Sequence, residues 1–149
     1  MRRIKFKRVE GNTDLPLPEY ATPGAAGMDL RAFLPEGAVV FETGDLHMIS
    51  VGFCVELPVG TEMQIRPRSG MALKHRVVIP NSPGTVDADY RGEVKCGLLY
   101  LGAAPFTISH GDRIAQAVIA DVLRLPMEEV ETLSETDRGA GGFGSTGRA

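Results

Sequence analysis

Asn81-Ser-Pro-Gly-Thr-Val-Asp-Ala-Asp-Tyr-Arg-Gly-Glu-Val-Lys95 is the stretch that decides the fold of this chain. Turn-forming residues lie towards both of its ends, and this spacing predicts a β-hairpin. Asp87 and Asp89 are two positions apart, so they would share one face of a strand. Tyr90 would point to the opposite face unless the chain turns there, and Asp89 and Gly92 favour such a turn.

Outward from this segment, short apolar or β-branched runs alternate with turn residues. The expected strands are residues 4–6, 28–33, 38–41, 46–57, 61–65, 77–79, 93–101 and 113–125. The run 113–125 could also be a short helix, but its Ile and Val content and the preceding Gly111-Asp112 turn favour a strand. In 93–101, the side chains of Val94, Cys96, Leu98 and Tyr100 alternate onto one face.

Residues 69–75 could form one or two turns of helix, with Ser69 as the N-cap. The chain is therefore expected to be all-β, a distorted jelly roll or β-barrel of many short strands with one short helix. Its 18 glycines and 10 prolines disfavour long helices. The length of 149 residues and a hydrophobic content of 43% suit a single domain, residues 1–149, with a core.

Charge and hydropathy exclude several classes of function. The net charge of −3 argues against broad nucleic-acid binding, which needs excess cations. No apolar run approaches the ~20 residues of a membrane span, and the basic N-terminus lacks the apolar stretch of a signal peptide. A cytoplasmic protein without a membrane partner is expected. Cys54 and Cys96 lie in apolar runs and are expected to be buried free thiols, since two thiols without a nearby His pair make a poor zinc site.

After Pro126 the chain becomes acidic and then glycine-rich, so residues 126–149 are expected to form a flexible C-terminal arm. Its end, Arg138-Gly-Ala-Gly-Gly-Phe-Gly-Ser-Thr-Gly147, has too many glycines to fold alone. Arg138, Phe143, Ser145 and Thr146 nevertheless supply a cation, an aromatic ring and two hydroxyls beside open backbone N–H groups. Such groups bind phosphate and stack on a base. The alternative is a solubilising tail without a ligand.

Two further segments carry residues suited to a ligand. Arg68, Ser69 and Gly70 open the predicted helix and could bind phosphate oxygens, although the same residues would serve as a plain N-cap beside a surface arginine. In Gly111-Asp-Arg-Ile-Ala-Gln116, the amide of Gln116 needs hydrogen-bond partners that a ligand or the backbone could supply. Asp112 and Arg113 could pair locally.

Residues 81–95 contain further candidate site residues. Asp87 could be a general base or a metal ligand, with Asp89 an equal candidate on local sequence alone, and both could simply shape a turn. Asn81 carries an amide able to read the edge of a base by donating and accepting.

Taken in order, five segments resemble the sequence motifs of the trimeric all-β deoxyuridine triphosphatases (dUTPases). They are Pro23-Gly-Ala-Ala-Gly-Met-Asp-Leu-Arg-Ala32, Pro67-Arg-Ser-Gly-Met-Ala72, residues 81–95, Gly111-Asp-Arg-Ile-Ala-Gln116 and residues 138–147. The resemblance implies a jelly-roll homotrimer whose sites are each built by three chains, the arm of one closing a pocket formed by the other two. It implies Mg²⁺-assisted hydrolysis of dUTP to dUMP and pyrophosphate, which lowers dUTP and supplies dUMP for dTMP synthesis.

The resemblance also implies roles in the chemistry. Asp87 would activate a water for in-line attack on the α-phosphorus, and Ser69 would donate to the oxygen that leaves with pyrophosphate. Contacts to phosphate would come from Arg68, the Gly70 N–H, Gln116, Arg138, Ser145 and Thr146. Asp29 would reach the hydrated Mg²⁺ indirectly through water, unless it only orders the backbone.

Recognition of the nucleoside would come from residues 81–95 and the arm. Asn81 and the backbone around Thr85, Val86 and Lys95 would pair with the uracil edge, which would reject cytosine and thymine. Tyr90 would pack on the deoxyribose and exclude a 2′-hydroxyl, and Phe143 would stack on the uracil.

Two alternatives are kept beside this interpretation. A deoxycytidine triphosphate deaminase, on a related fold, uses a glutamate on the equivalent hairpin and lacks the full arm motif, so Asp87 and the arm speak against it. A catalytically silent nucleotide-binding relative should have lost a base, a cation or the arm.

Met28 stands where the family commonly has an aromatic residue or leucine, which should affect packing only. His75 and His110 adjoin motifs but match no catalytic position.

Overall fold

The computed structural model describes residues 2–142, which form ten strands and one short helix. The strands are β1 (Lys5–Arg8), β2 (Gly27–Arg31), β3 (Ala38–Phe41), β4 (Leu46–Glu56), β5 (Thr61–Pro67), β6 (Val77–Val78), β7 (Gly84–Val86), β8 (Glu93–Tyr100), β9 (Phe106–Ser109) and β10 (Arg113–Asp121). The helix is α1 (Ser69–Lys74). Phe143, Ser145 and Thr146 lie outside the described residues. The all-β prediction with one short helix is confirmed.

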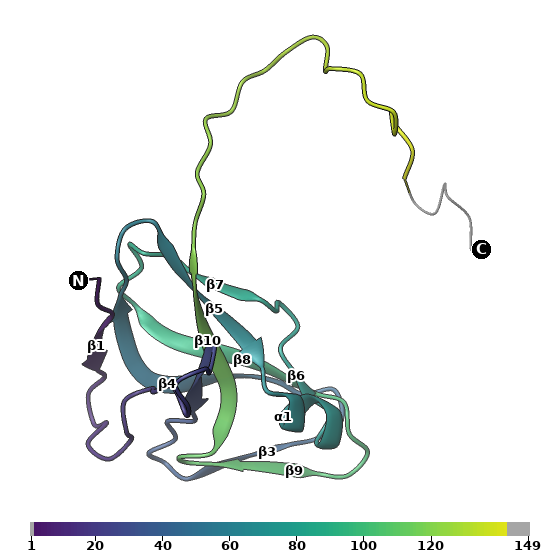
Figure 1. Ribbon diagram of the computed structural model, residues 1–149. Coiled ribbons are helices and arrows are strands. Elements are labelled where there is room, and N and C mark those ends of the chain that lie inside the picture. The colour runs from purple at the N-terminus through teal and green to yellow at the C-terminus, as the bar shows by residue number, and fades with distance from the viewer. Residues whose placement is uncertain (1, 143–149) are drawn as a thin grey trace.

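Two four-stranded sheets and one strand pair make up the body, as Figure 1 shows. One sheet has the order β1-β4-β8-β6 and the other β2-β10-β5-β7, while β3 pairs with β9. Every pair is antiparallel. The strand β9 was not predicted, although Phe106 and Ile108 alternate with polar residues as a half-buried strand requires.

The core lies between the two sheets because alternate side chains of each sheet point inward. On β8 these are the four residues whose alternation the sequence predicted, and all four are buried. On β5, Met63 and Ile65 enter the same core cluster from the opposite sheet. One continuous core joining both sheets holds β7 and β8 in fixed positions on either side of it.

The predicted β-hairpin of residues 81–95 is wrong. β7 pairs with β5 and β8 pairs with β4, so the two strands belong to different sheets. The turn residues do reverse the chain, with the Tyr90 N–H donating to the Asp87 carbonyl at 3.1 Å. The reversal carries the chain across from one sheet to the other, because turn chemistry fixes the direction of the chain but not the partner of the strand that follows.

Smaller differences concern element ends. Arg68 is the N-cap of α1 and makes no side-chain cap hydrogen bond, so the prediction of Ser69 as N-cap is wrong by one residue. The strand predicted at 113–125 is confirmed but ends at Asp121. Cys96 is buried as predicted, whereas Cys54 is only half-buried, and both are free thiols.

Candidate active site

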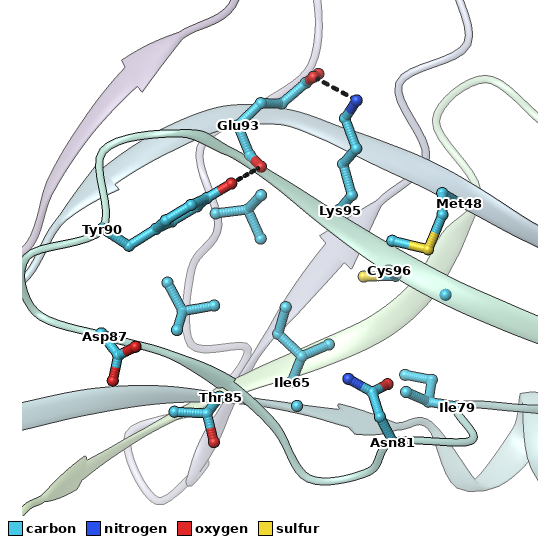
Figure 2. A pocket seen from close by; sticks show the side chains of 14 residues that line it. Met48, Ile65, Ile79, Asn81, Thr85, Asp87, Tyr90, Glu93, Lys95 and Cys96 are labelled. Atoms are coloured by element: carbon cyan, nitrogen blue, oxygen red, sulfur yellow. Dashed lines mark hydrogen bonds and ion pairs between the residues drawn. The ribbon is translucent and has the colours of Figure 1, made fainter.

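A cavity of about 410 Å³ lies between β7 and β8, where the chain crosses between the sheets. It collects six of the residues singled out from the sequence. These are Asn81, Thr85, Val86, Asp87, Tyr90 and Lys95. Figure 2 shows the side chains that it labels arranged around the opening, with Asp87 and Tyr90 at one end and Asn81 at the other.

The cavity exists because two strand edges face each other without pairing. β7 is the last strand of its sheet, with β5 on its other side. β8 pairs with β4 along most of its length, but on its other side β6 reaches only Leu99 and Tyr100. Within residues 2–142, backbone N–H and C=O groups of both strands therefore point towards the cavity without a strand partner. A planar ligand edge with donors and acceptors can take the place of the missing strand.

The loop between β7 and β8 distinguishes the two aspartates that the sequence left open. Asp87 follows the last residue of β7, is exposed, and lines the cavity. Asp89 lies in the turn and does not line it. The turn also allows Tyr90 to face the cavity, with its hydroxyl donating to the Glu93 carbonyl at 3.0 Å. Gly92 makes this possible, because a Cβ there would lie 2.5 Å from Cζ of the Tyr90 ring.

The cavity floor is apolar. Ile65, Ile79 and Val94 are buried core residues that also line it. Burial raises the pKa of the Cys96 thiol to about 12, so this side chain is a neutral packing group and not a nucleophile. Sequence reasoning did not find Ile65 or Ile79, because an apolar residue on a strand looks the same whether it meets protein or ligand.

Four of the phosphate-binding candidates form a second group elsewhere in the described part of the chain and do not line the cavity: Arg68, Ser69, Gly70 and Gln116. Arg68 Nε lies 2.8 Å from Asp29 Oδ1 in an ion pair, and Arg113 Nη1 donates to Asp29 Oδ2 at 3.2 Å. The predicted local pair of Asp112 and Arg113 is therefore wrong. The Asp112 carboxylate instead accepts the Ser109 N–H at 2.8 Å, which closes the turn before β10.

Ser69, Gly70 and Gln116 belong to the same region. Ser69 is exposed on the first turn of α1, and nothing lies within 4 Å of where a Gly70 side chain would begin. The Gln116 amide donates to the Pro67 carbonyl at 2.9 Å, so the backbone is one of its partners. The residues predicted for the nucleoside and those predicted for the phosphates thus form two separate groups within one chain.

The arm leaves the body where β10 ends and runs away from both sheets, as Figure 1 shows. Large apolar side chains are exposed both in the arm and in the residues that lead into it from β10, namely Leu123, Leu125, Met127 and Leu133. Arg138 lies in a turn, where its Nε donates to the Gly141 carbonyl at 2.8 Å. Large apolar side chains that stay exposed along such a segment have surface left to bury elsewhere.

No group of three or more His, Cys, Asp and Glu side chains within residues 2–142 could hold a metal ion. No helix there has the length and hydrophobicity needed to cross a membrane.

Comparison with known proteins gives consistent matches over nearly the whole chain. The sequence model of the dUTPase family matches residues 13–147. The deoxyuridine 5'-triphosphate nucleotidohydrolase of Caulobacter vibrioides is 59% identical over 145 residues, 97% of this chain and 94% of that protein. The enzyme of the same name from Treponema pallidum is 58% identical over 130 residues, 87% of this chain and 89% of its own. Among solved structures, the dUTPase of Staphylococcus bacteriophage 80alpha with dUPNHPP is 26% identical, with a TM-score of 0.84 over 97% of this chain and 98% of that one.

Proposed function

The chain belongs to the dUTPase family, and from this premise we propose that it hydrolyses dUTP to dUMP and pyrophosphate with Asp87 as the general base. The observation that carries the proposal is the cavity between β7 and β8, which gathers the nucleoside-binding residues and Asp87 around one opening. An exposed carboxylate at the mouth of a nucleoside-sized cavity is well placed to hold a water beside the phosphate nearest the sugar.

Selection of uracil would rest on the two unpaired strand edges. Backbone groups at Thr85, Val86 and Lys95, together with the Asn81 amide, can complement the alternating acceptors and donor of the uracil edge. Cytosine exchanges an acceptor for a donor and would leave buried polar groups unpaired, which can discriminate by ~10⁴. The Tyr90 ring, held by the Glu93 carbonyl, would press on the deoxyribose where UTP carries an additional hydroxyl.

The triphosphate would be bound by the second group of residues. Arg68, Ser69, the Gly70 N–H and Gln116 are the donors proposed for it, with Ser69 serving the oxygen that leaves with pyrophosphate. Because these residues do not line the nucleoside cavity of their own chain, they would complete the cavity of a neighbouring subunit. The apolar arm, with Arg138 and the residues after it, would close the same shared site in a homotrimer.

Mg²⁺ is proposed to enter with the substrate. Both carboxylate oxygens of Asp29 are already ion-paired, one with Arg68 and the other with Arg113, so Asp29 suits a contact through a metal-bound water better than a direct metal bond. When bound, the ion supplies neutralisation of the phosphate charge.

One assay tests the proposal. The protein is incubated with Mg²⁺ and dUTP, dCTP, dTTP or UTP, and both pyrophosphate and ammonia are measured. Pyrophosphate from dUTP alone is expected; ammonia from dCTP would indicate the deaminase, and binding without turnover a silent relative. We expect Asp87→Asn to bind dUTP but lose at least ~10²-fold in kcat, whereas Asp89→Asn changes it little. Equal losses in both variants would refute the assignment of the base.

A further inference from the structure

Glu93 makes contacts in three directions at the edge of the cavity. Its backbone carbonyl accepts the Tyr90 hydroxyl at 3.0 Å. Its carboxylate accepts a hydrogen bond from the Ser50 hydroxyl through Oε1 and lies 3.2 Å from the Lys95 ammonium through Oε2. Figure 2 shows the contacts to Tyr90 and Lys95 on the same side of the cavity. One residue therefore contacts the proposed sugar-binding ring, a cavity-lining cation and the neighbouring strand.

These contacts lie where the pairing of β4 and β8 is interrupted. Ser50 is opposite Lys95 and Cys54 is opposite Glu93, so residues 51–53 of β4 face Val94 alone. The backbone ladder is lost across such a bulge. Gly52 within it has φ of +76°, and its N–H donates to the Ser50 hydroxyl at 2.9 Å. The hydrogen bonds from the Gly52 N–H to the Ser50 hydroxyl, and from that hydroxyl to the Glu93 carboxylate, thus connect the two strands where their backbones do not pair.

We propose that Glu93 is a positioning residue that fixes the substrate-facing edge of β8 and the Tyr90 ring, an inference that rests on the proposed hydrolysis of dUTP. Residues 93–97 of β8 line the cavity where the nucleobase is proposed to bind, so movement of this edge would alter the pairing. The bulge removes the ladder bonds that would otherwise hold that edge. The Glu93 carboxylate supplies the replacement, and its side chain is 29% exposed, which leaves the contacts only partly screened by water.

The contacts of the carboxylate separate its role from that of the proposed base. In the described part of the chain, the polar contacts of the Glu93 carboxylate are with Ser50 and Lys95. Its loss is expected to weaken nucleoside binding and sugar selection while sparing the chemical step. Ser50→Ala removes one link of the chain without changing charge, and Glu93→Gln keeps an acceptor for Ser50 while removing the ion pair with Lys95.

The test compares Glu93→Ala, Glu93→Gln and Ser50→Ala with Glu56→Ala in steady-state assays with dUTP and UTP. Glu56 is the matched control, because it is an ion-paired carboxylate on β4 of the same sheet and does not line the cavity. For Glu93→Ala we expect KM for dUTP to rise about tenfold, kcat to stay within about threefold, and the preference for dUTP over UTP to fall at least ~10-fold. Ser50→Ala should change KM and preference in the same direction, and Glu93→Gln should recover part of both.

The proposal is overturned if Glu93→Ala lowers only kcat or only the melting temperature, with KM and sugar preference unchanged. If Glu93→Ala does not fold, Ser50→Ala decides the question by the same two readouts. The wild-type protein supplies the separate test of the proposed function. Wild-type hydrolysis of dUTP with unaltered variants refutes the role of Glu93 alone, whereas absence of wild-type turnover refutes the function on which it rests.

Discussion

Replacing Gly92 by alanine should loosen sugar selection without destabilising the protein. Gly92 is not among the glycines with positive φ, so alanine fits its backbone. The obstacle is the Tyr90 ring, because a Cβ at Gly92 would lie 2.4 Å from Oη, 2.5 Å from Cζ and 2.9 Å from Cε2. The ring and the new methyl group cannot both occupy these positions.

The size of the effect follows from these distances. Ordinary contacts of a Cβ begin near 3.4 Å, so the ring must retreat by about 1 Å from the methyl group. A displacement of ~1 Å in a positioning group can cost as much as ~10²-fold in rate. The hydroxyl would also lose its hydrogen bond to the Glu93 carbonyl, worth about 1 kcal/mol. We therefore expect kcat/KM for dUTP to fall ~10- to 100-fold and the preference for dUTP over UTP to fall at least ~10-fold.

Kinetics with dUTP and UTP, together with thermal unfolding, separate ring displacement from loss of structure. Gly24→Ala is the matched control, since nothing lies within 4 Å of its missing side chain. The melting temperature of Gly92→Ala should change little, because alanine also reduces the entropy of the unfolded chain. In a Tyr90→Ala background, Gly92→Ala should cause no further loss of activity. An equal loss in both backgrounds would refute displacement of the ring as the cause.

Three further predictions concern the arm and the two cysteines. Deletion of residues 138–149 should leave a folded protein with the oligomeric state of the full chain, as measured by light scattering. Its dUTP turnover, measured by pyrophosphate release, should be severely reduced. Full activity would show that the arm is dispensable. At pH 8, a thiol reagent should label the half-buried Cys54 of the native protein and leave Cys96 unlabelled until unfolding, because burial raises the pKa of Cys96 to about 12. Since the folded pKa is the higher one, the contribution of the neutral Cys96 thiol to stability is fully present below its usual pKa of 9.0 and is lost as pH rises towards 12, which denaturant titrations of wild type and Cys96→Ala would measure.

The strands were predictable where one face is buried. Alternation alone identified the inward side chains of β8, because a half-buried strand imposes a period of two on the sequence. The partner of each strand was not predictable in the same way. Turn residues indicated that the chain reverses after Asp87, but the sheet that β8 joins depends on β4, which lies some forty residues earlier.

The candidate site was also predictable from the sequence only in part. Asp87, Asn81 and Tyr90 were predictable as a group because they stand within one short segment whose residue types suit a nucleotide. The contacts that hold them were not, since Ser50 and Glu93 are ordinary strand residues until the bulge in β4 brings them together. The Asp29 pairs with Arg68 and Arg113 likewise join segments far apart in the sequence.

Under the proposed function, the arrangement of the chain favours a site that is shared between copies. The proposed nucleoside cavity opens between β7 and β8, whereas Asp29 and Arg113 line a different pocket. A dUTP molecule bound in the cavity needs cations near its phosphates, because about four negative charges repel the attacking water. The leucines exposed after β10 could be buried against a neighbouring copy. Neighbouring copies would supply both the cations and the apolar surface. Dilution that separates the subunits should therefore abolish turnover and free the arm, both at the same protein concentration.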